Sequence, residues 1–184
     1  MTVNIDSHTQ RFLYILMFRV NRQTDYAVRV LLALAKKPQG TRISTQEIGR
    51  EMLVPRVLIQ RIVATLANSG FIVTQAGRDG GISLAHAPSQ INLLQVVELF
   101  EGPIILSDCI LKQGDCPFEL RCPVSCQWKR LSDLLRQEMA QTTFEQLVED
   151  AKQIEAELHN SASAPKPIPV SVVKNLPLAD NLSV

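Results

Sequence analysis

Three helical segments in the first half of the chain most constrain its fold. Apolar residues recur at the i, i+3, i+4 spacing of a helix in residues 22–37. The run Ser-Thr-Gln-Glu at 44–47 is a capping box, which predicts the start of a short second helix that ends near residue 54. Pro55 fits the first turn of a third helix, which is expected to run to residue 69.

A glycine-rich turn between two short β segments follows these helices. Residues 71–74 and 82–84 carry β-forming side chains, and the run Gly-Arg-Asp-Gly-Gly at 77–81 lies between them, which predicts a hairpin. Three helices followed by a hairpin are typical of a winged helix-turn-helix. The predicted fold is therefore mainly α with a small β-hairpin.

The third helix is the expected DNA-reading element. We expect it to bury an apolar stripe made of Val57, Leu58, Ile62 and Leu66. Arg56, Gln60 and Arg61 lie off that stripe, and in a helix-turn-helix such side chains reach base edges in the major groove. Arg78, at the tip of the hairpin turn, is expected to contact a phosphate or the minor groove.

The distribution of charge supports a nucleic-acid partner. The net charge of the chain is only +1, but residues 21–90 hold nine Lys and Arg against four Asp and Glu, and residues 91–184 hold eight against thirteen. A basic first half on a nearly neutral chain indicates that this half contacts double-stranded DNA.

Two further helices are expected beyond the hairpin and a short helix at 91–101. A long helix begins near residue 124, and another runs from residue 142 to 158. The long helix carries apolar residues near a heptad seam: Trp128, Leu131, Leu134, Leu135 and Met139. This spacing is typical of a helix that packs on another helix, either in the same chain or in a partner subunit.

All four cysteines fall within 18 residues, in the pattern C-x6-C-x5-C-x3-C. They are Cys109, Cys116, Cys122 and Cys126. Structural zinc sites favour two tight C-x2–4-C pairs, whereas a wide loop with spread thiolates better encloses an iron–sulfur cluster. Structural zinc and metal-free thiols that sense oxidation remain alternatives at this point.

No membrane span or export signal is expected. The longest apolar stretch, residues 12–18, is far shorter than the roughly 20 residues of a spanning helix. A cytoplasmic location is therefore expected, where thiols stay reduced and available for metals. No thioredoxin-like C-x-x-C, phosphate loop or Ser/His/Asp set is present, which argues against an enzyme.

Four parts of the chain are expected. Residues 1–17 form an N-terminal extension, with Met17 as an alternative start, and residues 18–90 form the winged helix-turn-helix DNA-binding domain. Residues 91–158 hold the cluster-binding loop and the dimerisation helices, and residues 159–184 form a disordered tail rich in proline.

Residues 18–150 resemble the iron–sulfur winged-helix transcriptional regulators that include NsrR and IscR. The resemblance rests on Thr-Asp-Tyr-Ala at 24–27, Gly-Arg-Asp-Gly-Gly-Ile-Ser-Leu at 77–84, the three-cysteine loop, and Trp128 six residues after the third cysteine. It implies a homodimeric DNA-binding repressor or activator whose promoter affinity follows the state of an iron–sulfur cluster. The implied signals are nitric oxide, redox poise or iron supply.

The resemblance also implies a ligand set. Cys109, Cys116 and Cys122 would hold the cluster, with a 4Fe–4S form favoured and 2Fe–2S as the alternative. NsrR-like members, which this chain resembles most, use the aspartate of the Thr-Asp-Tyr-Ala run as fourth ligand, here Asp25. IscR-like members use a histidine where this chain has Ser125, and the extra thiol of Cys126 is an alternative fourth ligand.

Overall fold

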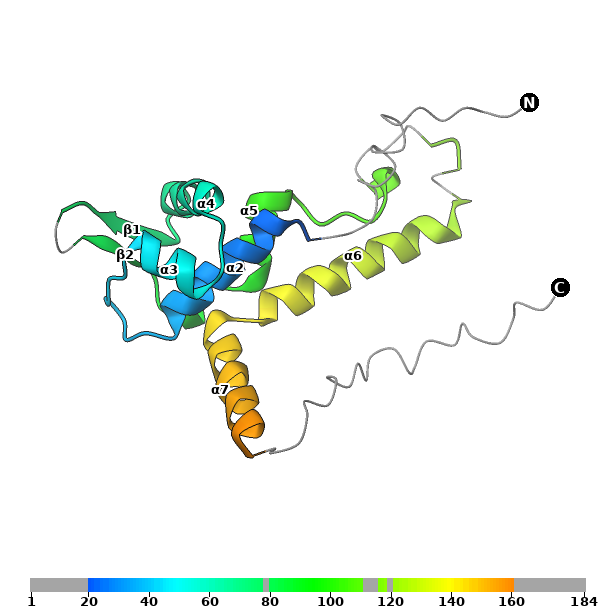
Figure 1. The fold of residues 1–184 in the computed structure, drawn as a ribbon. Coiled ribbons are helices and arrows are strands. Elements are labelled where there is room, and N and C mark those ends of the chain that lie inside the picture. Colours follow the sequence, from blue (N-terminus) through cyan, green and yellow to red (C-terminus); the bar gives the residue numbers. More distant parts are fainter. Residues whose placement is uncertain (1–19, 78–79, 111–115, 119–120, 161–184) are drawn as a thin grey trace, which may run out of the picture. The chain divides into compact units, whose positions relative to one another are not determined.

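Three helices and a hairpin form the N-terminal part of the structure, a computed structural model that describes residues 20–77, 80–110, 116–118 and 121–160. These elements are α2 (Arg22–Ala35), α3 (Thr45–Glu51), α4 (Arg56–Asn68), β1 (Ile72–Gln75) and β2 (Gly81–Leu84). Their order confirms the predicted winged helix-turn-helix (Figure 1).

Local sequence signals set the starts of the first helices. The Asn21 side chain accepts a hydrogen bond from the Thr24 backbone amide and caps α2. The Ser44 hydroxyl accepts one from the Glu47 amide at 3.1 Å, as its capping box predicts, and starts α3. Pro55 directly precedes α4.

The buried face of α4 differs from the prediction. Its buried residues are Ile59, Ile62, Val63 and Leu66. Ile62 and Leu66 were expected there and Leu58 is partly buried against the core, but Val57 is 85% exposed. The buried residues follow helical spacing from Ile59, and this spacing puts Val57 on the opposite side of the helix.

The wing is tied to the residue before α3. β1 pairs antiparallel with β2, with Ile72 opposite Leu84. Ile43 and Ile82 exchange backbone hydrogen bonds of 3.0 and 2.9 Å, which join the hairpin to the start of the helix-turn-helix. Gly81 lies so close that an added Cβ would be 2.7 Å from the Ile43 carbonyl oxygen. Arg78, which was predicted at the tip of the hairpin, lies outside the described residues.

The second half of the described chain is helical. Its elements are η2 (Pro88–Gln90), α5 (Leu93–Glu101), η3 (Asp108–Ile110), α6 (Pro123–Gln141) and α7 (Phe144–Asn160). α5 packs on α2 and on α6, and η3 lies against α6. The Thr143 hydroxyl accepts from the Gln146 amide and caps α7, whose first turn puts Phe144 in the core.

One aliphatic core joins these elements. It takes residues from α2, α3, α4, the base of the wing, α5 and the first turns of α7. The chain divides into two units, residues 1–149 and 150–184; the first holds this core, and the described residues of the second are the last part of α7. The predicted extension and nearly all of the predicted tail fall outside the described residues. Among the described helices, none has the length and apolarity needed to cross a membrane.

Candidate DNA-binding face and cysteine segment

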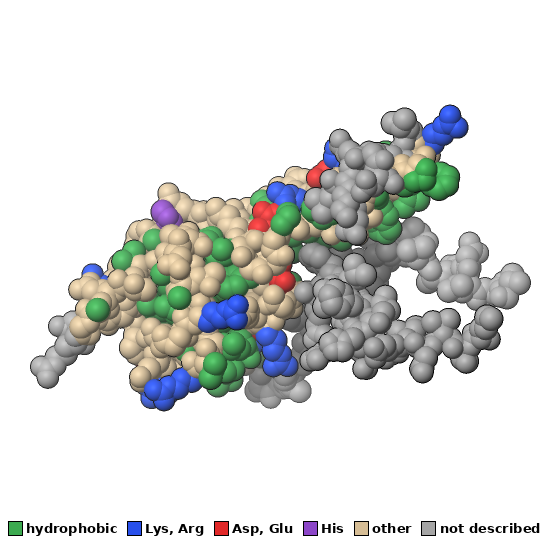
Figure 2. Space-filling view, turned by 90° about the horizontal axis from the view of Figure 1, so that it is seen from above, with side chains coloured by type: hydrophobic (Ala, Val, Ile, Leu, Met, Phe, Trp, Pro, Cys, Tyr) green, Lys and Arg blue, Asp and Glu red, His purple; other side chains and the backbone are tan. Residues whose placement is uncertain are grey.

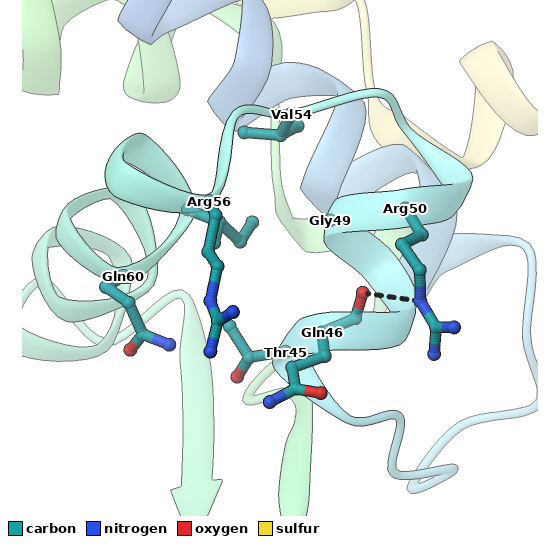
Figure 3. Close-up of a pocket in the computed structure, with 8 residues that line it drawn as sticks. Thr45, Gln46, Gly49, Arg50, Val54, Arg56 and Gln60 are labelled. Atoms are coloured by element: carbon teal, nitrogen blue, oxygen red, sulfur yellow. Dashed lines mark hydrogen bonds between the residues drawn. The ribbon is translucent and has the colours of Figure 1, made fainter.

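A groove between α3 and α4 gathers polar side chains from both helices. The groove has a volume of about 320 Å³. Thr45 and Gln46 from α3, together with Arg56 and Gln60 from α4, point to the same side of it (Figure 3). Gln46 and Arg50 are joined by a 3.4 Å hydrogen bond from the Arg50 Nε to the Gln46 carbonyl. Donors from two helices on one side suit contact with bases and phosphates.

The groove includes residues that sequence reasoning did not name. Arg56 and Gln60 were predicted, and the structure brings them together; Arg61 is exposed one position further along α4. Thr45 and Gln46 were missed. The capping box identifies the start of α3 and so could have pointed to them, because helix N-terminal residues commonly contact phosphates.

Acidic side chains occur on α3 but not on α4. α3 holds two glutamates and α4 holds none. Figure 2 shows basic side chains next to exposed hydrophobic ones on the face of the winged-helix part that it displays. A surface with basic and apolar side chains is suited to DNA, which carries anionic phosphates and the methyl groups of thymine.

Three of the four cysteines lie in the segment between α5 and α6, and the fourth is in α6. Cys109 is in η3, Cys122 directly precedes α6, and Cys116 lies between them; all three are half-buried and free of disulfides. Cys126 is exposed in the first turns of α6. Within the described residues, no three Cys, His, Asp or Glu side chains lie close enough together to hold a metal ion.

A buried serine ties this segment to α6. The Ser132 hydroxyl accepts a 3.2 Å hydrogen bond from the Leu106 amide and donates one of 2.9 Å to the Trp128 carbonyl. Ser132 is only 4% exposed. The cysteine segment is thereby fixed to α6 three residues before Cys109, whose Sγ is 3.1 Å from the Ser107 hydroxyl.

Glu101 connects the end of α5 to the start of α2. Its Oε1 accepts hydrogen bonds from the Asn21 backbone amide at 2.8 Å and from the Thr24 hydroxyl at 2.5 Å, and its Oε2 accepts one from the Asn21 side-chain amide at 2.9 Å. Asp25 follows Thr24 and forms an ion pair with Arg29 at 2.7 Å. These hydrogen bonds therefore hold the end of α5, which leads into the cysteine segment, next to the first turn of α2, where Asp25 lies.

The sequence of this chain matches a known family of regulators. A sequence profile of the Rrf2 family, described as an iron-dependent transcriptional regulator, matches residues 20–150. The chain belongs to the Rrf2 family. It is a DNA-binding transcriptional regulator and not an enzyme, as the sequence predicted.

Named relatives of this Rrf2 protein come from several bacteria. Protein Aau3 of Rhizobium meliloti is 29% identical over 138 residues, which are 74% of this chain and 88% of Aau3. The regulator NsrR of Bacillus licheniformis is 30% identical over 91 residues, half of this chain and 64% of that relative.

Solved structures share the fold of this Rrf2 protein. IscR of T. potens superimposes with a TM-score of 0.61 at 16% identity, over 82% of this chain and 96% of its own. The oxidised form of Staphylococcus aureus CymR superimposes with a TM-score of 0.56 at 25% identity, over 72% and 97%.

Proposed function

We propose that this Rrf2 regulator holds an iron–sulfur cluster through Cys109, Cys116 and Cys122, and that the cluster controls its affinity for promoter DNA. The observation that carries the proposal is three unpaired, half-buried thiols in one segment of a chain whose family profile is described as iron-dependent. The similarity to NsrR supports the same function.

The chemistry of the donor set fits such a cluster. Thiolates are its usual protein ligands, and half-buried positions both shield it from water and leave it open to small molecules. When bound, the cluster supplies iron that reacts with nitric oxide and oxygen. The residues of this chain position the thiols: η3 carries Cys109, and the start of α6 carries Cys122.

Asp25 is the proposed fourth ligand, contributed to the partner subunit's cluster. Its side chain is 48% exposed, and its present partner is Arg29, one turn along α2. An exposed i, i+4 ion pair contributes only about 0.3–0.5 kcal/mol, so ligation would displace a weak contact. Cys126 remains the alternative ligand, because it is exposed on α6 close in sequence to Cys122.

The contacts of α2 give the cysteine segment a route to the DNA-binding face. α5 enters that segment, Glu101 bonds α5 to the first turn of α2, and α2 packs on α4. A change that moves the end of α5 would also displace Thr24, which is fully buried. Because Thr24 is in α2, the displacement would reach the helix that supports α4. The proposed regulation therefore acts through helix packing.

The same proposal includes a homodimer through α6. Four apolar side chains of this helix are between 38% and 48% exposed: Val124, Trp128, Leu131 and Leu134. A second copy of the chain that covered them would set the distance between two α4 helices. Because half-sites on DNA lie about one helical turn apart, that distance decides affinity.

The test is iron analysis and DNA binding of full-length protein purified without air. We expect iron and sulfide in the wild type and a visible absorption band. Nitric oxide should bleach this band and weaken promoter binding over the same titration range. Loss of colour with unchanged DNA affinity would contradict the proposed control.

Matched variants assign the ligands. Cys109→Ala, Cys116→Ala and Cys122→Ala should each abolish iron incorporation. Asp25→Ala should alter the spectrum, whereas Cys126→Ser should leave it unchanged. The reverse result for the last two variants would make Cys126 the fourth ligand, and iron binding by all three cysteine-to-alanine variants would refute the site.

Thiol oxidation is a second candidate function. Four free thiols, one of them exposed, and the similarity to the oxidised form of CymR favour it. Two thiols would give two electrons and two protons to an oxidant such as peroxide and form a disulfide. An iron-free or zinc-bound protein whose DNA affinity responds to peroxide would favour this candidate.

A further inference from the structure

Val57 stands exposed among the polar residues of the DNA-reading helix. It is the second residue of α4 and is 85% exposed, the largest exposed fraction among the large hydrophobic residues of the described chain. A side chain this exposed gains little from burial in the fold, because stabilisation by apolar side chains scales with the area removed from water. Its exposed position on this helix is suited to a contact with a binding partner.

Helix geometry puts Val57 at the centre of the outer face of α4. Residues of an α-helix are about 100° apart around its axis, so the buried stripe of α4 is centred about 180° away from Val57. Gln60 and Arg61 follow at i+3 and i+4, which makes them the neighbours of Val57 on that face. Both are exposed.

The surroundings of Val57 are those of a DNA-contacting surface. Arg56 precedes it, and the side chains of Arg56 and Gln60 lie together in the groove shared with α3 (Figure 3). In a helix-turn-helix, the N-terminal residues of the second helix face the base edges. Val57 is in the first turn of that helix, so DNA is the partner that would cover it.

The major groove offers one apolar feature to such a side chain. Each base edge presents hydrogen-bond donors or acceptors there, and only thymine adds a methyl group. We infer that Val57 is a specificity-determining residue that packs on a thymine 5-methyl group, while Gln60 and Arg61 beside it bind polar edges or phosphates. This inference needs the DNA-binding role of the family but not the iron–sulfur cluster.

The test removes the methyl group from the DNA and the side chain from the protein. Full-length protein purified without air first enriches binding sites from a pool of random DNA duplexes. Each thymine of the enriched site is then replaced in turn by deoxyuridine, which lacks only the 5-methyl group. Dissociation constants are measured for the wild type, Val57→Ala and Leu53→Ala.

For the wild type, we expect at least one deoxyuridine position to weaken binding about fourfold, as loss of one buried methyl group predicts. Val57→Ala should bind the thymine site about as weakly as the wild type binds the deoxyuridine site. Replacing that thymine by deoxyuridine should then cause little further loss of affinity in Val57→Ala. Leu53→Ala is the control, because Leu53 is 80% exposed but lies in the turn before α4, and it should respond as the wild type does.

Two results would overturn the inference. One is an equal loss at the same thymine in the wild type and in Val57→Ala, which would mean that another residue contacts the methyl group. The other is a wild type that tolerates deoxyuridine at every position. Thermal unfolding at an unchanged midpoint would show that Val57→Ala keeps its fold, as the exposure of this side chain predicts.

Discussion

Removing the Glu101 carboxylate should loosen the junction of α5 and α2. The carboxylate accepts three hydrogen bonds, from the Asn21 backbone amide, the Asn21 side chain and the Thr24 hydroxyl. Water replaces the carboxylate readily at Asn21, which is exposed, but not at Thr24, which is fully buried. Glu101→Ala should therefore lower the free energy of unfolding by about 2 kcal/mol, the range of one bond to a charged acceptor.

The Thr24 hydroxyl has one other acceptor, the Asn21 side-chain oxygen at 3.3 Å. This weaker hydrogen bond limits how much the free energy of unfolding falls in Glu101→Ala. Glu101→Gln keeps an acceptor oxygen for Thr24 and should lose about half as much as Glu101→Ala. Together with Thr24→Val, Glu101→Ala forms a double-mutant cycle with an expected coupling of about 1 kcal/mol.

Urea unfolding of the full chain measures these values. All variants need the same protein concentration and the same iron content, because association and bound groups shift apparent stability. A loss below about 0.5 kcal/mol for Glu101→Ala, the size of an ordinary surface substitution, would refute the reasoning. So would two single variants whose effects simply add.

Three further outcomes follow from the structure. Gly81→Ala should lower the free energy of unfolding by more than about 1 kcal/mol in urea, because its Cβ would meet the Ile43 backbone at 2.7 Å and φ is +156°; unchanged stability would contradict the close approach. Ser44→Ala should lower it by about 1 kcal/mol through loss of the α3 cap, and a neutral result would show that the cap contributes little. Leu131→Asp with Leu134→Asp should convert a dimer to a monomer in sedimentation experiments, and a persistent dimer would place the interface elsewhere.

Local signals predicted the fold well. The expected first helix, 22–37, differs from α2 by only two residues at its end, and the Ser44 cap lies where the capping box indicated. The glycine-rich turn predicted the hairpin because chain reversal needs residues without side-chain clashes. These features are set within a few residues of sequence, so they need no knowledge of tertiary contacts.

Features that depend on tertiary packing were harder to predict. Val57 was expected in the core as part of an apolar stripe with Leu58, Ile62 and Leu66, but the packing of α2 and α3 decided which side of α4 is buried. The bond between Thr24 and Glu101 joins residues 77 positions apart and left no local pattern. For the cysteines, spacing indicated a shared site, whereas the proposed fourth ligand, Asp25, lies more than 80 positions away in the sequence and has no spacing pattern that links it to them.

The bridge between Ile43 and Ile82 has a consequence for protein engineering. The hairpin is in effect a three-stranded unit, because Ile43 pairs with β2 as a third, one-residue strand. Ile43 lies in the loop that leads into α3. Anyone who exchanges this wing for that of a relative would also have to transplant residue 43 and its backbone course. A graft limited to residues 72–84 would keep both backbone hydrogen bonds only if its backbone at position 82 followed the same course beside Ile43.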